Sequence, residues 1–399
     1  MQRLRVGFLS SQNYLDKNAW SGTLYYMHKA LNERDLQVVN LGEPKKPSLT
    51  QKILNRLRKN NTSFKAGSPG YIANCKKFES LVQTQLAKTP CDVIFAPVAS
   101  SELKFLETNI PVIYLSDATF NLYHQFYQLD LDEQEIEWGA SQETIAISKA
   151  SKLVYPSQWA ADSASSDYKA KAGKIAIIPF GANLDAPPLA EEVLSKKQTS
   201  SCRLLFVGKN WYRKGGDIAF QTLTSLREQG IDAELVVIGC VPPPEIQHDK
   251  LTVIPYLDKN VPQQRKQLDE LFLKSHFFIL PTRADCSPIV VCEASAFGLP
   301  VITTAVGGIP TLIKNGKNGY LLPLSASGDD YANLIAENFS DGTRYENLVR
   351  SSRREYDTCL NWDKWSESLH QVITDMLKQK NLQQKASLIK GTPEVAISR

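Results

Sequence analysis

Paired cysteines and long apolar runs are both missing from this sequence. Its seven cysteines form no Cys-x-x-Cys pair, and their odd number and wide scatter speak against a disulfide framework. No segment offers about 18 uninterrupted apolar residues, and residues 1–20 hold only a short apolar run. We therefore expect a cytoplasmic protein with reduced thiols and with neither a signal peptide nor a transmembrane helix.

A strong charge excess and the common nucleotide-binding loops are missing as well. The 46 Lys and Arg residues against 42 Asp and Glu give a formal net charge of +4, too little to indicate a nucleic-acid partner. No pair of His or Cys has metal-ligand spacing, so no metal site is expected. There is no G-x-x-x-x-G-K-[ST] loop, and no G-x-G-x-x-G follows the first apolar run. A P-loop ATPase and a dinucleotide-dependent enzyme are therefore both disfavoured.

Short apolar runs alternate with longer stretches of helical character, first over 4–179 and again from 203 onward. This alternation predicts two α/β units, each a doubly wound parallel sheet with crossover helices. The predicted strands of the first unit are 4–9, 36–41, 91–97, 111–115, 152–156 and 174–179. Those of the second are 203–208, 234–239, 277–281 and 299–303. At 399 residues the chain is long enough for two such domains.

A polar stretch with a Pro pair, residues 181–201, has no strand pattern and is the expected interdomain linker. The end of the chain, from about residue 384, has the composition of a frayed tail. The sequence is accordingly divided into a first domain, a second domain, a final helix and a tail. Their ranges are 1–185, 186–365, 366–383 and 384–399.

The segment "PTRADCSPIVVCEASAFGLP", residues 281–300, predicts a loop and a helix after a buried strand. Ser287 suits the N-cap, Pro288 the first helical position and Gly298 the C-terminal stop. The loop then lies at the carboxyl end of the strand, where open α/β sheets place ligands. The free backbone amides of Ile289 and Val290, with the helix dipole, form a predicted phosphate site.

Two carboxylates flank that predicted phosphate site. Glu293 lies on the same helix face as Ile289 and Val290, one turn deeper, and Asp285 approaches from the loop. Carboxylates accept hydrogen bonds and repel phosphate, so they suit the hydroxyls of a ribose and a sugar. The alternative is that Glu293 is an ordinary helix residue and Asp285 a loop residue that caps a turn.

A cluster of basic residues follows the first strand of the second unit, in "VGKNWYRKGG" over 207–216. Lys209, Arg213 and Lys214 would meet an anion at the same sheet edge that carries Asp285. Two such side chains can hold a diphosphate, whereas the simpler reading is a solvated basic loop.

Taken together, these residues resemble glycosyltransferase family 4, retaining enzymes of the GT-B fold that use nucleotide-sugar donors. Residues 283–323 resemble the family's E-x7-E region and the segments after it, and 206–216 its basic loop. Residues 18–31 resemble its glycine loop, with Gly22 as the matching glycine. Segments 177–185 and 362–365 resemble the end of the first domain and the start of the returning helix. By this resemblance the first domain, 1–185, would be the acceptor side, and the second, 186–365, would bind the donor.

The resemblance implies a role for each site residue. Lys209 and Lys214 would neutralise the pyrophosphate, Glu293 would bind the ribose, and Asp285 would hold the transferred sugar. The sequence departs from the family at Asp285 (for glutamate), Pro288 (for glycine) and Lys209 (for arginine). The usual histidine of the first domain is missing as well, and Asp117 is its nearest substitute.

The implied reaction is a retaining, metal-independent transfer to an acceptor hydroxyl from a nucleotide-diphosphate sugar, with a UDP-sugar favoured. Catalysis would rest on Asp117, Lys214 and Asp285; donor binding would rest on Gly22, Lys209, Lys214, Ser287, Ile289, Val290 and Glu293. Two alternatives stay open, a nucleotide-sugar epimerase of the same fold and a silent nucleotide-sugar binding module. No nucleic-acid partner is expected, and the acceptor is not identified.

Residues 45–66 form a basic amphipathic stretch, with Lys52, Arg56, Arg58 and Lys59 around three aliphatic residues. Such a stretch can rest on an anionic lipid surface at the inner face of the membrane. A solvated helix face is the more common outcome for this pattern.

Overall fold

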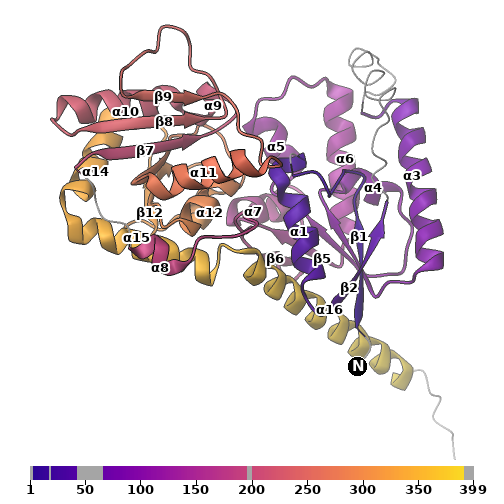
Figure 1. Cartoon of the computed structure of the whole chain (residues 1–399). Coiled ribbons are helices and arrows are strands. Elements are labelled where there is room, and N and C mark those ends of the chain that lie inside the picture. Colours follow the sequence, from indigo (N-terminus) through magenta and orange to yellow (C-terminus); the bar gives the residue numbers. More distant parts are fainter. Residues whose placement is uncertain (1–2, 18, 43–65, 196–199, 391–399) are drawn as a thin grey trace, which may run out of the picture.

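The computed structural model describes residues 3–17, 19–42, 66–195 and 200–390, and the backbone alone at 383–390. Two parallel six-stranded sheets occupy this part of the chain, one in each lobe of the molecule (Figure 1). The predicted α/β architecture with two doubly wound sheets is confirmed. Residues 43–65, and with them nearly all of the predicted lipid-binding stretch 45–66, lie outside the described residues.

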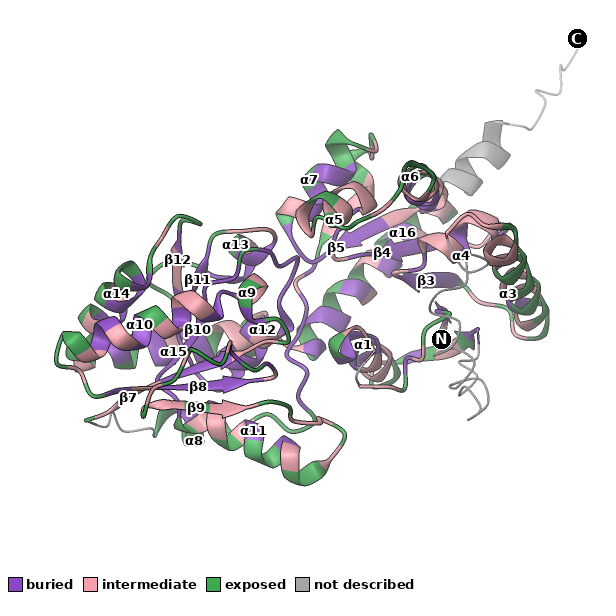
Figure 2. Cartoon of the chain, turned by 90° about the horizontal axis from the view of Figure 1, so that it is seen from above, coloured by how far each residue is buried: buried purple, intermediate pink, exposed green. Residues whose placement is uncertain are grey.

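The first sheet has the strand order β2-β1-β3-β4-β5-β6, and every pair between neighbours is parallel. Its strands are β1 (Leu4–Leu9), β2 (Leu36–Leu41), β3 (Val93–Pro97), β4 (Val112–Leu115), β5 (Lys152–Tyr155) and β6 (Ile175–Ile177). The central strands β3 and β4 are buried along their whole length, as is typical of parallel sheets covered on both faces (Figure 2).

The second sheet has the order β12-β11-β10-β7-β8-β9. Its strands are β7 (Cys202–Val207), β8 (Ala233–Ile238), β9 (Leu251–Ile254), β10 (Phe277–Leu280), β11 (Val301–Thr304) and β12 (Gly319–Leu322). The direction of winding reverses between β7 and β10, so the loops that follow these two strands meet at one point of the sheet edge. That is where open α/β sheets bind ligands.

Two strands were missed by the sequence prediction, β9 and β12. Only partly buried residues and one exposed residue make up β9, and β12 begins at Gly319, so neither has the continuous apolar run of a central strand. Both lie at the edges of the sheet, where burial on two faces is not needed.

Helices cover both faces of each sheet, and their exposed sides face outward (Figure 2). In the first domain they are η1 (Ala19–Gly22), α1 (Thr23–Asn32), α3 (Pro69–Lys88), α4 (Ser100–Phe105), α5 (Phe120–Phe126), α6 (Glu133–Lys149), α7 (Gln158–Ser166) and η4 (Ala172–Lys174). In the second they are α9 (Trp211–Lys214), α10 (Gly216–Glu228), α11 (Pro262–Lys274), α12 (Ile289–Ala296), α13 (Ile309–Leu312), α14 (Gly328–Ser340) and α15 (Gly342–Thr358). A short helix, α8 (Ala190–Leu194), lies within the predicted linker.

The last helix, α16 (Trp362–Lys390), runs beneath both lobes and returns to the first domain (Figure 1). Trp362, Trp365 and Leu369 belong to the same apolar cluster as Val6 and Phe8 of β1. The helix therefore begins four residues before the predicted start at 366. It also continues through residues 384–390, which were predicted as tail; residues 391–399 lie outside the described part.

The chain passes between the domains twice, and the two crossings lie against each other. The Ala182 amide donates to the Leu360 carbonyl at 3.0 Å, and the Trp362 indole donates to the Asn183 side chain at 2.9 Å. A Cβ on Gly181 would come within 2.4 Å of the Trp362 backbone nitrogen, so glycine allows this close approach. The predicted boundary at 185/186 falls just after the first crossing.

Gly215 joins α9 to α10 in the left-handed region, with φ 76°. A Cβ there would lie 1.9 Å from the Pro281 carbonyl oxygen, so a side chain would push apart the loops that follow β7 and β10. Gly230 has a similar φ of 81° with nothing within 4 Å of its Cβ position, which makes it a matched control.

We predict that Gly215→Ala lowers the free energy of unfolding by about 3 kcal/mol, because it adds a steric clash to left-handed strain. Gly230→Ala should cost about 1 kcal/mol from strain alone. Urea unfolding of the two variants measures the difference. Equal losses would mean that the close approach at Gly215 adds nothing.

Candidate functional site

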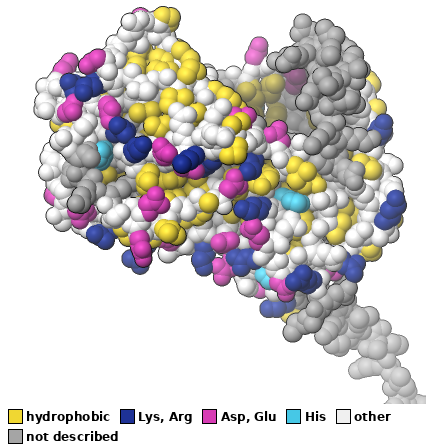
Figure 3. Space-filling view, in the orientation of Figure 1, with side chains coloured by type: hydrophobic (Ala, Val, Ile, Leu, Met, Phe, Trp, Pro, Cys, Tyr) yellow, Lys and Arg dark blue, Asp and Glu magenta, His cyan; other side chains and the backbone are white. Residues whose placement is uncertain are grey.

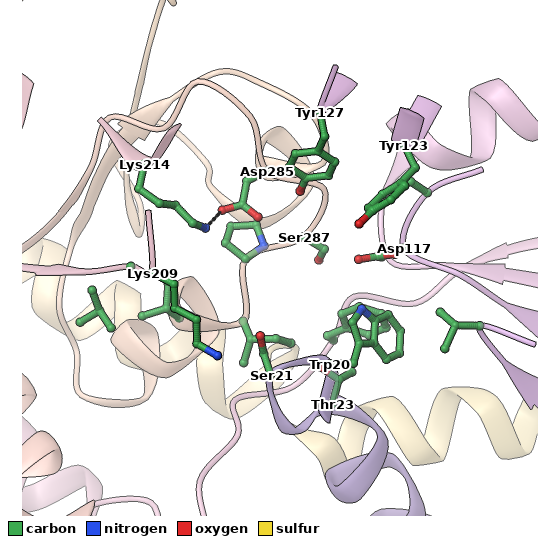
Figure 4. A pocket seen from close by; sticks show the side chains of 18 of the residues that line it. Trp20, Ser21, Thr23, Asp117, Tyr123, Tyr127, Lys209, Lys214, Asp285 and Ser287 are labelled. Atoms are coloured by element: carbon green, nitrogen blue, oxygen red, sulfur yellow. Dashed lines mark hydrogen bonds and ion pairs between the residues drawn. The ribbon is translucent and has the colours of Figure 1, made fainter. Parts of the chain in front are cut away.

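A cavity of about 860 Å³ lies between the two domains and is lined by both. Figure 3 shows the hollow between the lobes, and Figure 4 its interior. Among the predicted site residues, all but Gly22 line it: Asp117, Lys209, Lys214, Asp285, Ser287, Ile289, Val290 and Glu293. The structure thus brings residues from several loops and helices into one space.

Lys214 and Asp285 form an ion pair across the point where the winding of the second sheet reverses (Figure 4). Lys214 ends α9, which is capped by the Asn210 side chain, and Asp285 lies in the loop after β10. Both side chains are largely buried. Lys209 also lines the cavity, and no described residue forms an ion pair with its ammonium group. Lys209, Lys214 and the Asp285 carboxylate therefore lie on the same wall of the cavity.

Helix α12 begins one residue later than predicted. Its N-cap is Pro288 and its first residue Ile289, and the Ser287 side chain makes no capping hydrogen bond. The Ser287 hydroxyl points into the cavity instead (Figure 4). Val291 donates its amide to the Pro288 carbonyl at 3.0 Å, whereas the amides of Ile289 and Val290 have no partner among the described residues. Two free amides and the helix dipole remain at this end, as an anion site requires.

Glu293 is tied to a lysine that the sequence prediction missed. The Lys259 ammonium lies 2.6 Å from Glu293 Oε1, and the carboxylate is only 1% exposed. Lys259 follows β9, the weak edge strand, so no strand signal placed it near α12. Its ammonium, together with the nearby Arg265 guanidinium, compensates the charge of this buried carboxylate.

Tyr127 is a second residue that sequence reasoning missed, and it joins the two domains. The Cys286 amide of the second domain donates to the Tyr127 hydroxyl at 3.2 Å. The Arg213 guanidinium lies over the Tyr127 ring, 5.3 Å from its centroid, a cation–π distance. Because both partners flank residues of the predicted site, Tyr127 positions the first domain against it.

The glycine loop of the first domain is strained. Trp20 and Ser21 have positive φ angles of 44° and 58°, and Gly22, the N-cap of α1, has φ 88°. Gly22 does not line the cavity, but Ser21 and Thr23 on either side of it do. A Cβ on Gly22 would come within 2.9 Å of the Lys17 carbonyl oxygen. Glycine is thus needed to shape this loop.

Asp117 follows β4, and its carboxylate points across the cavity toward Ser287 (Figure 4). Burial raises its pKa to about 6, and the nearby Asp285 carboxylate adds to the rise, while hydrogen bonds from Trp20 and backbone groups oppose it. The two carboxylates thus come from opposite domains and face the same space.

No group of three or more His, Cys, Asp or Glu residues in the described part of the chain is arranged to hold a metal ion. None of the helices formed by these residues has the length and apolarity to cross a membrane.

Residues 201–341, which contain this wall of the cavity, match the family model "Glycosyl transferases group 1". These residues are a glycosyl transferases group 1 domain. The curated relatives include spore coat protein SA of Bacillus subtilis, 24% identical over 325 residues, which cover 74% of this chain and 81% of the relative. They also include the D-inositol 3-phosphate glycosyltransferase of Streptomyces avermitilis, 24% identical over 252 residues. That match spans 57% of this chain and about half (52%) of the relative.

Solved structures share the fold over nearly the whole chain. A sucrose-phosphate synthase from Thermosynechococcus elongatus has a TM-score of 0.66 at 17% identity, covering 95% of this chain and 100% of its own. The Anabaena protein Alr3699/HepE in complex with UDP has a TM-score of 0.61 at 14% identity, covering 94% and 100%. The two-domain GT-B architecture predicted from the sequence is confirmed.

The shifted pKa of Asp117 makes stability depend on pH. Between its ordinary pKa of 3.8 and the folded value of about 6, the folded state holds a proton that the unfolded state has lost. Folding is therefore disfavoured progressively as pH rises through this window, and the full penalty persists above it. Because the side chain is only partly buried, about 3 kcal/mol is an upper value for that penalty.

We predict that Asp117→Asn raises the free energy of unfolding relative to the unchanged protein at pH 8 but not at pH 3.5. Asp130→Asn, at an exposed loop position, is the control and should have little effect at either pH. Chemical unfolding at the two pH values measures both. A stabilisation by Asp117→Asn that is equal at both pH values would contradict the titration argument.

Proposed function

We propose that the protein is a retaining glycosyltransferase that moves a sugar from a nucleoside-diphosphate sugar, UDP-linked in the favoured case, to an acceptor hydroxyl. The observation that carries this proposal is the grouping of Lys209, Lys214 and the free α12 amides around one point of the cavity.

The diphosphate fits between the lysines and the helix. Lys214 and Lys209 offer two cations, and the amides of Ile289 and Val290 offer two directed donors at the positive end of α12. As the bond between sugar and phosphate breaks, negative charge grows on the leaving diphosphate. Fixed donors that already point at this charge stabilise the transition state more than the ground state.

The two carboxylates are suited to hydroxyl groups because each has one oxygen engaged by a lysine. Lys214 holds one oxygen of Asp285, and Lys259 holds one oxygen of Glu293. The other oxygen of each can accept from a hydroxyl. Glu293, deeper on α12, would take the ribose, and Asp285, nearer the first domain, the transferred sugar.

In a retaining transfer of this kind the acceptor attacks the face that the diphosphate leaves. A new bond forms between the acceptor oxygen and the sugar's anomeric carbon, the bond from that carbon to phosphate breaks, and the acceptor proton passes to the leaving phosphate oxygen. Asp117, ionised at neutral pH, would orient the sugar or the acceptor by accepting a hydrogen bond. The protein's part is orientation, exclusion of water and charge stabilisation.

The similarity in fold supports a uridine nucleotide, because the Anabaena structures are complexes with UDP and with UDP-glucose.

The epimerase alternative has a specific observation in its favour as well. A UDP-N-acetylglucosamine 2-epimerase shares the fold, with a TM-score of 0.55 at 12% identity. An epimerase converts its nucleotide sugar without an acceptor, so analysis of products without acceptor separates the two, and a silent binding module gives no product in either case.

We predict that UDP-glucose raises the melting temperature of the unchanged protein more than GDP- or ADP-glucose does, with chelator present. Lys214→Met should weaken this binding by roughly 2 kcal/mol, about thirtyfold, because a charge-assisted contact to phosphate is lost. Lys266→Ala, on the exposed side of α11, is the control. Failure of every nucleotide sugar to stabilise the unchanged protein would contradict the proposal.

Removal of Lys214 also leaves Asp285 without its cation beside the phosphate. The double variant Lys214→Met/Asp285→Asn separates the two effects when the ligand is UDP, which lacks the sugar that Asp285 would hold. If binding returns in the double variant, the lysine serves to neutralise Asp285; if it stays weak, Lys214 contacts the diphosphate directly.

We further predict that transfer proceeds in excess chelator at an unchanged rate, since lysines and helix amides supply the positive charge that a divalent ion supplies in other sites. The measurement is the release of UDP from UDP-glucose with an active acceptor, with and without EDTA. Activity that vanishes in EDTA and returns with Mg²⁺ or Mn²⁺ would overturn metal independence and leave glycosyl transfer itself standing.

A further inference from the structure

The first-domain wall of the cavity holds a buried carboxyl group that the proposed chemistry does not use. Glu143, on α6, lines the cavity although its side chain is only 3% exposed. Its Oε2 accepts a hydrogen bond from the Tyr114 hydroxyl at 2.9 Å. Its Oε1 has no partner among the residues that the structure describes, and neither has the neighbouring Tyr155 hydroxyl. Oε1 is itself closed to solvent, so a bound molecule reaches it after a small turn of the carboxyl group. Buried polar atoms nearly always have a partner, so a bound molecule is the natural partner for this one.

The surroundings of Glu143 contain no cation, among the described residues, that pairs with it. Burial raises its pKa to about 8, and the Tyr114 hydrogen bond only partly opposes this. The titratable groups that interact with it are the hydroxyls of Tyr114, Tyr155 and Tyr168. At neutral pH the carboxyl is therefore mostly protonated. A neutral carboxyl group can both donate and accept a hydrogen bond.

An aromatic wall stands beside this carboxyl. Gly139 lies four residues before Glu143 on α6 and so on the same helix face. A Cβ on Gly139 would lie 2.2 Å from the Phe120 ring, so glycine lets Phe120 lie directly against the helix. Phe120 and Ser116 both line the cavity. We call Tyr114, Ser116, Phe120 and Glu143 the Glu143 subsite.

This composition differs from that of the opposite wall. Of the basic residues that line the cavity, Lys209, Arg213, Lys214 and Lys259 come from the second domain, and Lys17, which pairs with Asp185, comes from the first. The Glu143 subsite has instead an aromatic face, hydroxyls and one neutral carboxyl. Small-molecule sites with mainly apolar walls and a few fixed polar groups suit an uncharged ring that carries hydroxyls.

We propose that the Glu143 subsite binds the acceptor, as a hydroxylated and uncharged ring with one hydroxyl hydrogen-bonded to Glu143 Oε1. This inference rests on the proposed glycosyl transfer, and it adds the chemical class of the acceptor and the group that selects it. A ligand hydroxyl can form a hydrogen bond with the neutral carboxyl group either as donor or as acceptor. An ammonium group would need the ionised carboxylate, and an alkyl chain would leave Oε1 without a partner.

The test uses glucose as the probe, glucosamine as its amine counterpart and the UDP-loaded protein. Saturation-transfer NMR measures the affinity of each probe for the unchanged protein, for Glu143→Gln and for Glu143→Leu. We expect glucose to bind the first two alike, because glutamine keeps both a donor and an acceptor. Glu143→Leu should bind it at least tenfold more weakly. Glu137→Gln, at an exposed position of α6, is the control and should change nothing.

Three outcomes would overturn the inference. Glucose could bind all variants equally, it could fail to bind at all, or glucosamine could bind more tightly than glucose and be lost in Glu143→Gln. UDP affinity is measured in the same samples and should be equal in all. If the unchanged protein does not bind UDP, the proposed function fails. That outcome is distinguishable from a failure of the Glu143 subsite, in which UDP binds and glucose does not bind as expected.

A structure of the unchanged protein with UDP and glucose gives a second test that does not depend on the folding of Glu143→Leu. We expect a glucose oxygen within about 3.2 Å of Glu143 Oε1, a hydrogen-bond distance. Glucose seated only beside Asp285 would place it in the donor's sugar position and refute the Glu143 subsite.

Discussion

The pairing of two buried carboxylates with two lysines is the constraint on which the rest of the second domain's site depends. Asp285 and Glu293 stand at either side of the α12 N-terminus, and each would be costly to bury without a cation. Lys214 reaches Asp285 from the loop after β7, and Lys259 reaches Glu293 from the loop after β9. Four chain segments are thereby held around one point before any ligand arrives. The site is preorganised, so binding a ligand costs little free energy for ordering these four segments.

The first domain contributes to the same space mainly through apolar and aromatic contacts, with Lys17 and Asp117 as its charged groups. Ile289, at the start of α12, belongs to the apolar cluster of the first domain, with Val6, Phe8 and Trp365. Tyr127 reaches in the other direction to the Cys286 amide. The amides of α12 are therefore positioned by both domains at once. Under the proposed function, charge would select the ligand on the second-domain wall, and shape with a few neutral polar groups would select the ligand on the first.

Sequence reasoning identified the fold because the buried strands have continuous apolar runs, and it found the basic loop and the two carboxylates because they follow such strands directly. It failed where the signal is not local. Lys259 follows β9, a half-exposed edge strand with no such run, and Tyr127 and Glu143 lie on or beside helices whose facing partners are far away in the chain. Ser287 was predicted as a cap because serine commonly serves there, but the backbone places Pro288 at that position and turns the hydroxyl into the cavity.

The two crossings between the domains have a mechanical consequence. Because Ala182 is bonded to Leu360 and Asn183 to Trp362, the crossings act as a double-stranded strap rather than as two independent tethers. A strap of this kind bends readily across its width but resists twisting and shear. Any relative movement of the lobes would then follow a single axis, and closure would return the lysines and α12 amides to the same place opposite Asp117 and Glu143. Under the proposed function, this connection would keep donor and acceptor aligned.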